Sequence, residues 1–405
     1  MSELTEKQML ELAINSSEDL SNIVKAIAHK KRIEILGFLA NADQDFSRIL
    51  RTTKIGKTAL ANHISILIKH GLIERLERGT YSITSDGSMF LRVIITSFVE
   101  SRYHLEKERE QLLERYVRRE VSGEKQINDI KRLRYKPRWV THLGCVEGCL
   151  KYLKKKISTG WLYGGTGHGF VLNIARDLCP SGPTAWRTTM LYELASNLGY
   201  RVDGIFAQKS SPDFLKLQEE AWSHVRKCID DNIPCYGWEL SVPEYYIIYG
   251  YDDIGYYYSG PGIEDGTGPK PWKEIGNSHI GILEMYSVHI EASEDHQKAI
   301  KDAFTKVLYH ATNPDDIIFP NYRSGIQGYD WWIAAIKDGS AIAMGHSYNT
   351  AVWTECRKYA VEFLKEARKH VSSDVKHLIN EAKESYDIVY KSLERIQKDY
   401  PFSVS

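Results

Sequence analysis

Hydrophobic and polar positions alternate at helical spacing over residues 57–70. The apolar positions of this stretch form one stripe, made of Leu60, Ile64, Leu67 and Ile68. A shorter amphipathic stretch, residues 46–50, precedes it, and the turn at residues 55–56 separates the two. Two short strand-like runs follow within residues 73–83, on either side of Gly79. The pattern therefore predicts a helix, a turn, a second helix and a β-hairpin.

The face of this second helix opposite the apolar stripe suits contacts with DNA. Short polar groups reach base edges in the major groove, and basic groups neutralise phosphates. Residues 48–81 hold seven basic and two acidic side chains, so positive charge gathers where phosphate contacts are needed. The side chains expected to touch DNA are Lys57, Thr58, Asn62, His63, Lys69 and Arg78. The alternative interpretation is a small helical bundle with a hairpin and no DNA contact.

A family resemblance extends over the same region. The segments AIAHKKRIEILGFLA and TALANHISILIKHGLIERLERGTYSITSDGSMFL resemble the ArsR-type winged helix-turn-helix transcription regulators, through about residue 95. This resemblance implies a homodimer that binds double-stranded DNA with one recognition helix in each half-site. No cysteine precedes Cys145, and the histidines of this region lack the spacing of metal ligands, so we expect no metal here.

Residues 87–120 continue with apolar positions at helical spacing and a highly charged opposite face. A long helix with a narrow apolar seam after a wing is most simply a dimerisation helix, and packing onto the C-terminal part is the alternative. The linker is expected within residues 121–135. We therefore predict a winged-helix domain over residues 1–86 and a dimerisation and linker helix over residues 87–135.

Composition limits the class of protein further. The chain has 405 residues with 53 basic and 53 acidic side chains, so only the N-terminal part is expected to meet nucleic acid. Six scattered cysteines without a CxxC pair suit a reducing cytoplasm. The N-terminus is amphipathic and acidic, unlike a signal peptide, and no apolar run approaches the length of a membrane span. We expect a cytoplasmic protein with no membrane partner.

Strand-like runs, glycines and aromatic residues change the pattern after residue 136. Residues 139–285 alternate helical and strand-like segments, including a predicted hairpin in EYYIIYGYDDIGYYYSGPG. Residues 293–405 are predominantly helical in pattern. The fold class is therefore α+β, with a sensor domain predicted over residues 136–290 and a helical extension, residues 291–405, that completes a ligand-binding lobe.

The segments WVTHLGCVEGCLKYL and PCYGWEL…YYIIYGYDD…YYYSGPG resemble a second family, the papain-like fold of bacteriocin-processing peptidases and butirosin-biosynthesis acyltransferases. The resemblance implies a nucleophile at Cys145, where a helix N-terminus lowers a thiol pKa. The position of the catalytic histidine falls on Glu244 or Tyr245. We therefore expect a degenerate fold without catalytic residues. The alternative is a Cys145-dependent acyltransferase or amidase fused to a DNA-binding module, with His142 or His168 as a substitute base.

A cleft in such a domain would be rich in aromatic residues and carry one or two carboxylates, which suits a flat or cationic small molecule. The ligand-binding candidates are Cys145, Trp161, Tyr163, His168, Trp238, Glu244, Tyr246, Trp331 and Trp332. The alternative for each is ordinary core packing. The glycine-rich residues 164–169 resemble a phosphate loop only loosely, since they lack the GK[ST] ending.

The spacing of His142, Cys145 and Cys149 leaves a metal or haem site conceivable, although two small buried cysteines in a helix core are commoner. We expect no metal and no cofactor. The leading prediction is a dimeric transcription regulator that reads the major groove and senses a small molecule. A DNA-organising protein without a ligand cavity is the third interpretation.

Overall fold

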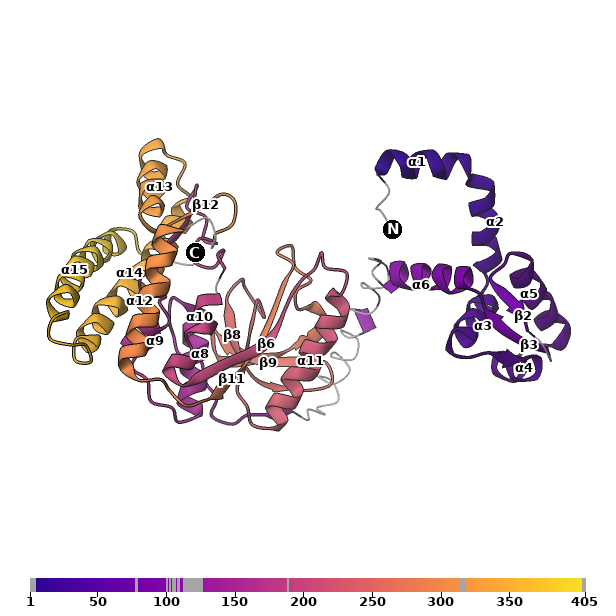
Figure 1. The fold of residues 1–405 in the computed structure, drawn as a ribbon, viewed down its shortest axis with the longest axis horizontal. Helices are drawn as coiled ribbons and strands as arrows, with labels where there is room; N and C mark the ends of the chain where they lie inside the picture. Colours follow the sequence, from indigo (N-terminus) through magenta and orange to yellow (C-terminus); the bar gives the residue numbers. More distant parts are fainter. Residues whose placement is uncertain are drawn as a thin grey trace. The chain divides into compact units, whose positions relative to one another are not determined.

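The computed structural model describes residues 5–76, 79–99, 101, 103, 107, 110–111, 127–187, 189–313 and 318–402 (Figure 1). The chain divides into two compact units, Met1–Gln111 and Leu112–Ser405, which we call the N-terminal unit and the C-terminal unit. No helix in the described part of the chain is both long and apolar enough to span a bilayer.

The N-terminal unit has the predicted order of helix, turn, helix and β-hairpin. Its elements are α1 (Glu6–Asn15), α2 (Ser17–Ile27), α3 (Lys30–Asn41), β1 (Gln44–Asp45), α4 (Phe46–Thr53), α5 (Lys57–Lys69), β2 (Ile73–Arg75), β3 (Thr80–Ile83) and α6 (Ser85–Val99). The strands form an antiparallel sheet in the order β1-β3-β2. This order and this pairing match the helix, turn, helix and hairpin predicted from the sequence.

One apolar core holds this unit together, with side chains from α2 to α6 and from the hairpin. Helix α6 approaches the chain very closely at Gly87, where a Cβ atom would lie 2.0 Å from the carbonyl oxygen of Leu72. Thr84 fixes this corner, because its Oγ1 donates to the carbonyl of Gly71 at 2.6 Å and accepts from the Gly87 N–H at 3.0 Å. The start of α6 is therefore locked onto the hairpin.

The predicted long helix begins where the apolar pattern places it. Helix α6 starts at Ser85 and is described as far as Val99. Residues 112–126, which hold the last part of the predicted helix and the first part of the predicted linker, lie outside the described residues. The dimerisation role of this segment stays a prediction.

The C-terminal unit is built on an antiparallel sheet. Its strands run in the order β10-β9-β8-β7-β11-β6, and β4 pairs with β8 beyond the end of β7. The strands are β4 (Asn128–Asp129), β6 (Tyr200–Gln208), β7 (Cys235–Trp238), β8 (Tyr245–Tyr251), β9 (Gly255–Gly260), β10 (Ile263–Pro271) and β11 (Ile282–Ile290). The predicted hairpin is formed by β8 and β9.

Two helices cover opposite faces of this sheet. Helix α8 (Thr141–Tyr152) packs on β7, β8 and β11, and α11 (Phe214–Asp230) packs mainly on β6 and β11. Tyr236 of β7 contacts His142 of α8 at 5.3 Å between ring centroids, whereas the neighbouring Cys235 acts on the pKa of Cys228 of α11. Successive side chains of a strand point to opposite faces, so the two helices lie on different sides.

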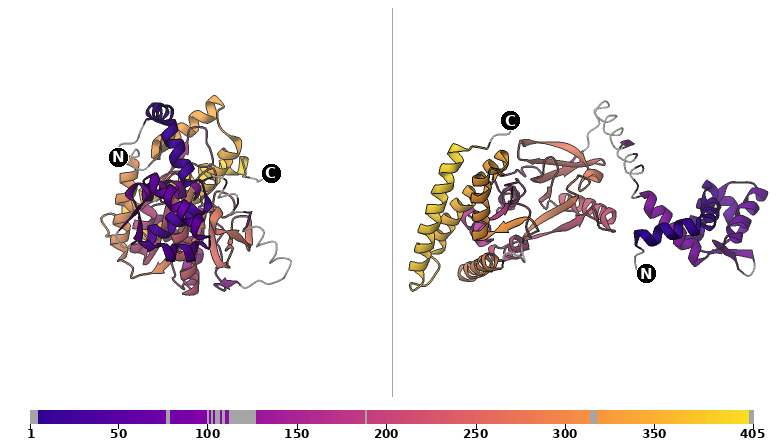
Figure 2. Two further views of the ribbon diagram at one scale, coloured as in Figure 1. Left: turned by 90° about the vertical axis from the view of Figure 1, so that its right-hand side faces the viewer. Right: turned by 90° about the horizontal axis from the view of Figure 1, so that it is seen from above.

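The remaining elements form a helical group beside the sheet (Figures 1 and 2). They are α9 (Thr159–Gly165), β5 (Asn173–Ala175), α10 (Thr189–Glu193), η2 (Ser196–Leu198), α12 (His296–Thr312), β12 (Tyr322–Ser324), α13 (Gly325–Asp338), α14 (Ala343–Ala367) and α15 (Lys376–Asp399). The short η3 (Trp272–Glu274) instead follows β10 and packs on α11 and β9. Helix α14 lies against α9 and α15, and most of its side chains are buried. Residues before and after position 290 share one apolar core, so the helical extension and the sheet form one body.

Candidate functional site

The polar face of α5 is open to solvent in the N-terminal unit. Lys57, Thr58, Asn62 and Lys69 are all exposed, while Leu60, Ile64 and Leu67 on the other side are buried. Residues 54–56 form the turn from α4, and Lys54 adopts a left-handed backbone conformation with φ of 52° to make it. The helix therefore presents two lysines, a hydroxyl and a carboxamide on one open surface beside the hairpin.

Three predictions for this region need correction or lie outside the structure. His63 is half-buried rather than open, because its ring packs 4.4 Å from the ring of His29. Its pKa is lowered by burial and by the nearby His29 and Arg32. Ile68 is 39% exposed, so it stands at the edge of the apolar stripe rather than inside it. Arg78 lies outside the described residues.

The C-terminal unit contains a cavity at the N-terminus of α8. About 420 Å³ of empty space, part of it open to solvent, lies among side chains from four regions of the chain. The lining residues are Trp139, Val140, Thr141, His142, His168, Pro183, Thr184, Leu191, Glu244, Tyr245, Tyr348 and Val352. The space open to the centre of a water-sized molecule is only about 30 Å³, enough for one or two waters and well below the roughly 300–1,000 Å³ typical of small-molecule sites.

A carboxylate and two hydroxyls meet on one wall of the cavity. Thr141, the first residue of α8, donates from its hydroxyl to Glu244 Oε2 at 2.5 Å. Tyr348 of α14 donates to Glu244 Oε1. The hydroxyl of Thr141 also accepts the backbone N–H of Tyr245 at 3.1 Å, which fixes α8 against the start of β8. Burial raises the pKa of Glu244, against the opposing effect of the two hydroxyl donors.

Two buried histidines complete the polar lining. Neither ring nitrogen of His168 has a hydrogen-bond partner among the described residues, and Nδ1 of His142 has none either. Burial lowers the pKa of each to about 3, so both imidazoles are neutral at physiological pH. A neutral imidazole offers one donor and one acceptor, and leaving such groups unpaired in a protein interior costs about 1–3 kcal/mol each. Their unpaired nitrogens leave hydrogen-bonding capacity inside the cavity.

The start of α8 is held from a distant part of the chain. Glu355 of α14 accepts the backbone N–H of Val140 at 3.2 Å and the hydroxyl of Tyr163 at 2.5 Å. Burial raises the pKa of Glu355, partly offset by these hydrogen bonds. Val140, the N-cap residue, makes no side-chain cap hydrogen bond, and Glu355 holds its backbone N–H in place. Two helices therefore set the geometry of the cavity together.

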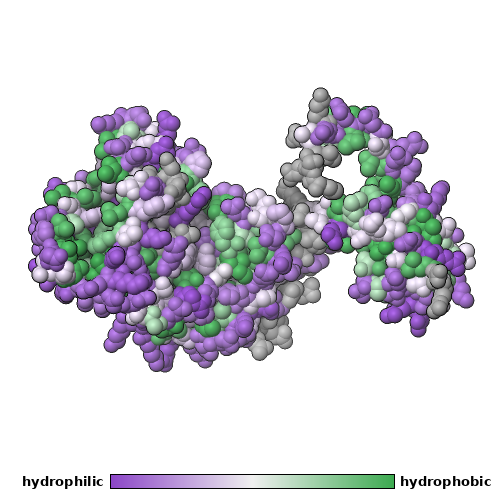
Figure 3. Space-filling view, in the orientation of Figure 1, coloured by the Kyte–Doolittle hydropathy of each residue, from purple (hydrophilic) through white to green (hydrophobic). Residues whose placement is uncertain are grey.

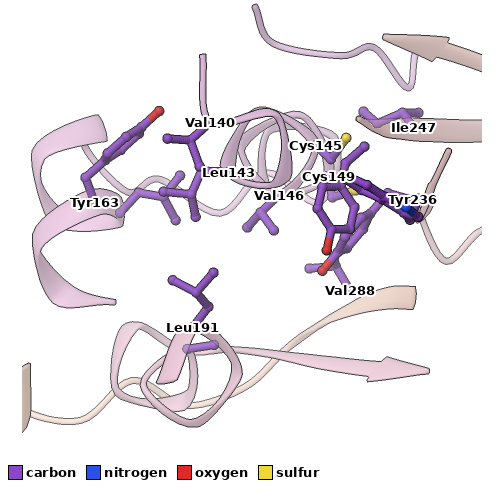
Figure 4. Packing of buried hydrophobic residues seen from close by; sticks show 14 of the residues in the cluster. Val140, Leu143, Cys145, Val146, Cys149, Tyr163, Leu191, Tyr236, Ile247 and Val288 are labelled. Carbon is purple, nitrogen blue, oxygen red and sulfur yellow. The ribbon is translucent and has the colours of Figure 1, made fainter. Parts of the chain in front are cut away.

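Cys145 does not occupy the predicted position at the helix N-terminus. Helix α8 begins at Thr141, so Cys145 lies in its second turn, fully buried beside Cys149 and Ile247 (Figure 4). Burial raises the pKa of its thiol well above the ordinary value, with a further contribution from Cys149. A buried protonated thiol away from the cavity is a poor nucleophile. The assignment of Cys145 to a ligand or catalytic site is therefore corrected to core packing.

Of the other predicted ligand-binding residues, only His168 and Glu244 line the cavity. The rest are packed elsewhere because each finds a partner within the fold: Trp161 on Phe363, Tyr163 on Glu355, Trp238 on Tyr245, Tyr246 on Tyr258, Trp331 on Arg323 and Trp332 on His346. His142, predicted only as a weak catalytic candidate, is part of the lining.

Sequence reasoning missed the residues that close the cavity. Thr141 could not be identified as the helix start, because the sequence there carries no local capping signal. Tyr348 could not be linked to the cavity, because it lies on α14, some two hundred residues away. No group of three or more histidine, cysteine or acidic side chains in the described part of the chain is arranged to hold a metal ion.

Comparisons with known proteins give one partial likeness. No family model and no curated protein matches the chain. A crystal structure of the transcriptional regulator HlyU from Vibrio vulnificus CMCP6 is similar to part of it, with 22% sequence identity and a TM-score of 0.20. The similarity covers 22% of this chain and 97% of that chain.

Proposed function

We propose that this chain is a dimeric DNA-binding transcription regulator whose C-terminal unit senses a small molecule. The observation that carries the proposal is the exposed polar face of α5, held by a turn against α4 and flanked by a hairpin. Lysines on this face would contact phosphates, and the Asn62 carboxamide has the donor and acceptor pair that reads adenine in the major groove.

Exposed apolar side chains on three helices support the homodimer. They are between 37% and 65% exposed, and they comprise Met9, Leu10, Leu12, Ile14, Leu20, Val24, Met89, Val93, Ile94, Ile95 and Phe98. Figure 3 shows part of this set as green atoms along α1 and α6. A gathering of this kind on a soluble unit marks an interaction surface, and a second copy of α1, α2 and α6 is the occupant we propose.

The cavity lining supports a small molecule of low net charge as the effector. Both imidazoles are neutral, and burial favours the protonated form of Glu244. The walls between these groups are apolar or aromatic, with Leu191, Val352 and Tyr245 among them. A compound with an apolar or aromatic body and hydrogen-bonding groups toward His142 and His168 fits this chemistry.

We assign no catalytic role to the C-terminal unit. If the papain-like resemblance holds, Thr141 occupies the helix start where the nucleophile is expected, and Glu244 faces it where the base is expected. The Thr141 hydroxyl donates to Glu244, and among the described residues no imidazole is hydrogen-bonded to it as a base. The unit would then keep the cleft of a degenerate papain-like fold and use it for binding. Effector binding would change the spacing of the two recognition helices in a dimer.

Binding to duplex DNA tests the first half of the proposal. Fluorescence anisotropy of the full chain with a labelled duplex should show an affinity that falls steeply as salt rises. The double variant Lys57→Ala with Lys69→Ala should weaken binding and flatten that salt dependence, with each phosphate contact worth a slope of about 0.9. A matched control is Lys337→Ala, which removes a charge from α13 of the other unit. An equal loss of DNA affinity in Lys337→Ala would contradict the assignment of α5 as the DNA-binding element.

A search for a bound compound tests the second half. Native mass spectrometry of the purified full chain, compared with the variant His142→Phe plus His168→Phe, should show a small molecule that only the wild-type chain retains. The phenylalanines keep the aromatic shape while removing the hydrogen-bonding nitrogens. A compound retained equally by both chains would show that the cavity is not its site.

A further inference from the structure

A second group of reactive side chains lies on the opposite face of the sheet from the cavity, under α11. Cys228 sits in the last turns of α11, and Cys235 begins β7 after a tight connection in which the Ile233 N–H donates to the Cys228 carbonyl at 2.7 Å. The Cys235 thiol donates to the Ile233 carbonyl at 3.6 Å, so it turns back toward the same connection. The connection therefore brings two thiols together at a fixed place in the fold.

A polar chain leads from this thiol pair to the edge of the unit. His224 Nε2 lies 3.8 Å from Cys228 Sγ and 3.2 Å from Ser287 Oγ. Ser287 Oγ is also 2.9 Å from His289 Nε2, and it donates to the Asp203 carbonyl at 3.3 Å. His289 Nε2 is in turn 3.6 Å from the Asp203 carboxylate. An imidazole at this place can donate to the Cys228 sulfur and favour its thiolate.

The two thiols differ in their surroundings. Hydrogen bonding from Cys235, and then from His224 and Ser287, lowers the pKa of Cys228 against the effect of burial. Burial raises the pKa of Cys235. Cys228 keeps 6% of its surface exposed, whereas Cys235 has none. Cys228 is therefore the thiol that a small reagent would meet first, and Cys235 is placed to react second.

We propose that Cys228 and Cys235 form a peroxide-reactive pair, in which Cys228 attacks a small hydroperoxide and Cys235 then closes a disulfide. In the first step the Cys228 thiolate attacks the outer peroxide oxygen, the O–O bond breaks and the leaving oxygen takes a proton, giving a sulfenic acid. In the second step the Cys235 sulfur attacks the Cys228 sulfur, its proton goes to the departing hydroxyl group and water leaves. The two thiols supply the two electrons that reduce the peroxide to water and an alcohol, or to two waters for hydrogen peroxide.

The surroundings favour this reaction over acyl transfer or metal binding. The alternation of β7 side chains separates the pair from the cavity, since Tyr236 faces α8 and Cys235 faces α11. None of the residues in the polar chain lines the cavity described above. The described side chains include no cluster suited to a metal ion. Two neighbouring thiols can reduce a small hydroperoxide without a metal ion.

Hydrogen peroxide applied to the native full-length protein tests the proposal. Both thiols lie on one tryptic peptide, residues 228–273, because Lys270 precedes a proline. After oxidation, acid quenching and alkylation, formation of the disulfide should appear as the loss of two hydrogen atoms from this peptide. The rate of this loss should be at least about tenfold higher than the rate at which Cys179 is oxidised. Cys179 is the reference because it is the only half-buried cysteine of the described chain. Oxidation of Cys179 first, or no loss of hydrogen from residues 228–273, would overturn the proposal.

Variants separate the roles of the three side chains. Cys235→Ser should leave Cys228 as a sulfenic acid that a cyclic diketone reagent traps, and His224→Gln should slow disulfide formation about tenfold while keeping both thiols. Cys179→Ser is the matched control and should oxidise like the wild type. An unchanged rate of disulfide formation in His224→Gln would show that the imidazole takes no part in the reaction. The proposal is independent of DNA binding, so either one can fail while the other stands.

Discussion

The surface of α5 and the cavity at the start of α8 place polar groups in opposite environments. Lys57, Asn62 and Lys69 stand in solvent, where water satisfies them until a partner replaces it. His142 and His168 are buried, and removal from water leaves nitrogens of both rings unpaired and lowers the pKa of each imidazole. The open surface should therefore respond to salt and hardly to packing, whereas the cavity should respond to pH and to the fit of its ligand.

The largest expected effect is a backbone clash that should destabilise the N-terminal unit and leave the C-terminal unit unchanged. In Gly87→Ala the new Cβ would lie 2.0 Å from the Leu72 carbonyl oxygen, and backbone cannot give way as a flexible side chain does. We expect a loss of about 3 kcal/mol or more in the stability of the N-terminal unit, and with it DNA binding. Calorimetry should show an unchanged transition for the C-terminal unit.

Gly37→Ala is the control for this prediction. Its Cβ would meet nothing within 4 Å on α3, so alanine should stabilise the helix by about 0.5–1 kcal/mol. If both variants lower the midpoint temperature of unfolding of the N-terminal unit equally, the close approach at Gly87 has no energetic importance.

The next effect concerns the pH dependence of the cavity. The pKa of His168 is lowered to about 3 in the folded chain, against 6.5 as its ordinary value. Between these values the unfolded chain binds a proton that the folded chain does not, so stability is full above pH 6.5 and falls as the pH drops toward 3. The loss is about 1.4 kcal/mol per pH unit for this side chain.

Urea unfolding of the wild type and of His168→Gln at pH 6, 5 and 4 measures this effect. The glutamine variant should lose less stability over the range, because it lacks the titrating group, while His142 titrates in both chains. Parallel pH profiles for the two chains would mean that His168 is not held neutral by burial.

A smaller effect tests which side chain of α5 reads bases. Asn62→Ala should weaken binding to the preferred duplex by about 1–3 kcal/mol and should relax the base preference at one position. His63→Ala should cost less, because that ring is already packed on His29. Competition binding with mutated duplexes measures both, and a larger loss for His63 than for Asn62 would reverse the assignment.

The smallest expected effect concerns Cys145. Cys145→Ala removes one buried sulfur and should cost about 1 kcal/mol of stability, with no change in the compound retained by the cavity. The native wild-type thiol should resist iodoacetamide at neutral pH, because burial keeps it protonated and covered. Rapid alkylation of Cys145 in the folded protein would restore the hypothesis of an acyltransferase or amidase.

Local pattern was enough for the winged-helix order, and it also found the β8–β9 hairpin and the helices of the C-terminal region. Helical spacing located α5, because Leu60, Ile64 and Leu67 are buried by their own repeat. It failed at Ile68, which is 39% exposed, and at His63, which packs on His29 at the start of α3. Periodicity identifies the apolar side of a helix, whereas its edges are decided by neighbouring helices.

The candidate cavity could be predicted only in part, because its geometry is non-local. His168 and Glu244 were chosen for their chemistry, and they do line it. The start of α8 was placed too late, since the N-cap residue Val140 makes no side-chain cap hydrogen bond and is held by Glu355, which lies 215 residues further along the chain. Most aromatic candidates failed for a related reason, because a tryptophan or tyrosine satisfied inside the core has the same sequence signature as one that lines a site.

Selection of bound duplexes from a random-sequence library by the full chain tests the central claim most directly. The account predicts enrichment of a two-fold symmetric sequence whose half-sites are about 34 Å, or one helical turn, apart, with no enrichment by the Lys57→Ala, Asn62→Ala and Lys69→Ala triple variant. Failure of the wild-type chain to enrich any sequence, or equal enrichment by the triple variant, would contradict the assignment of α5 as the element that reads DNA.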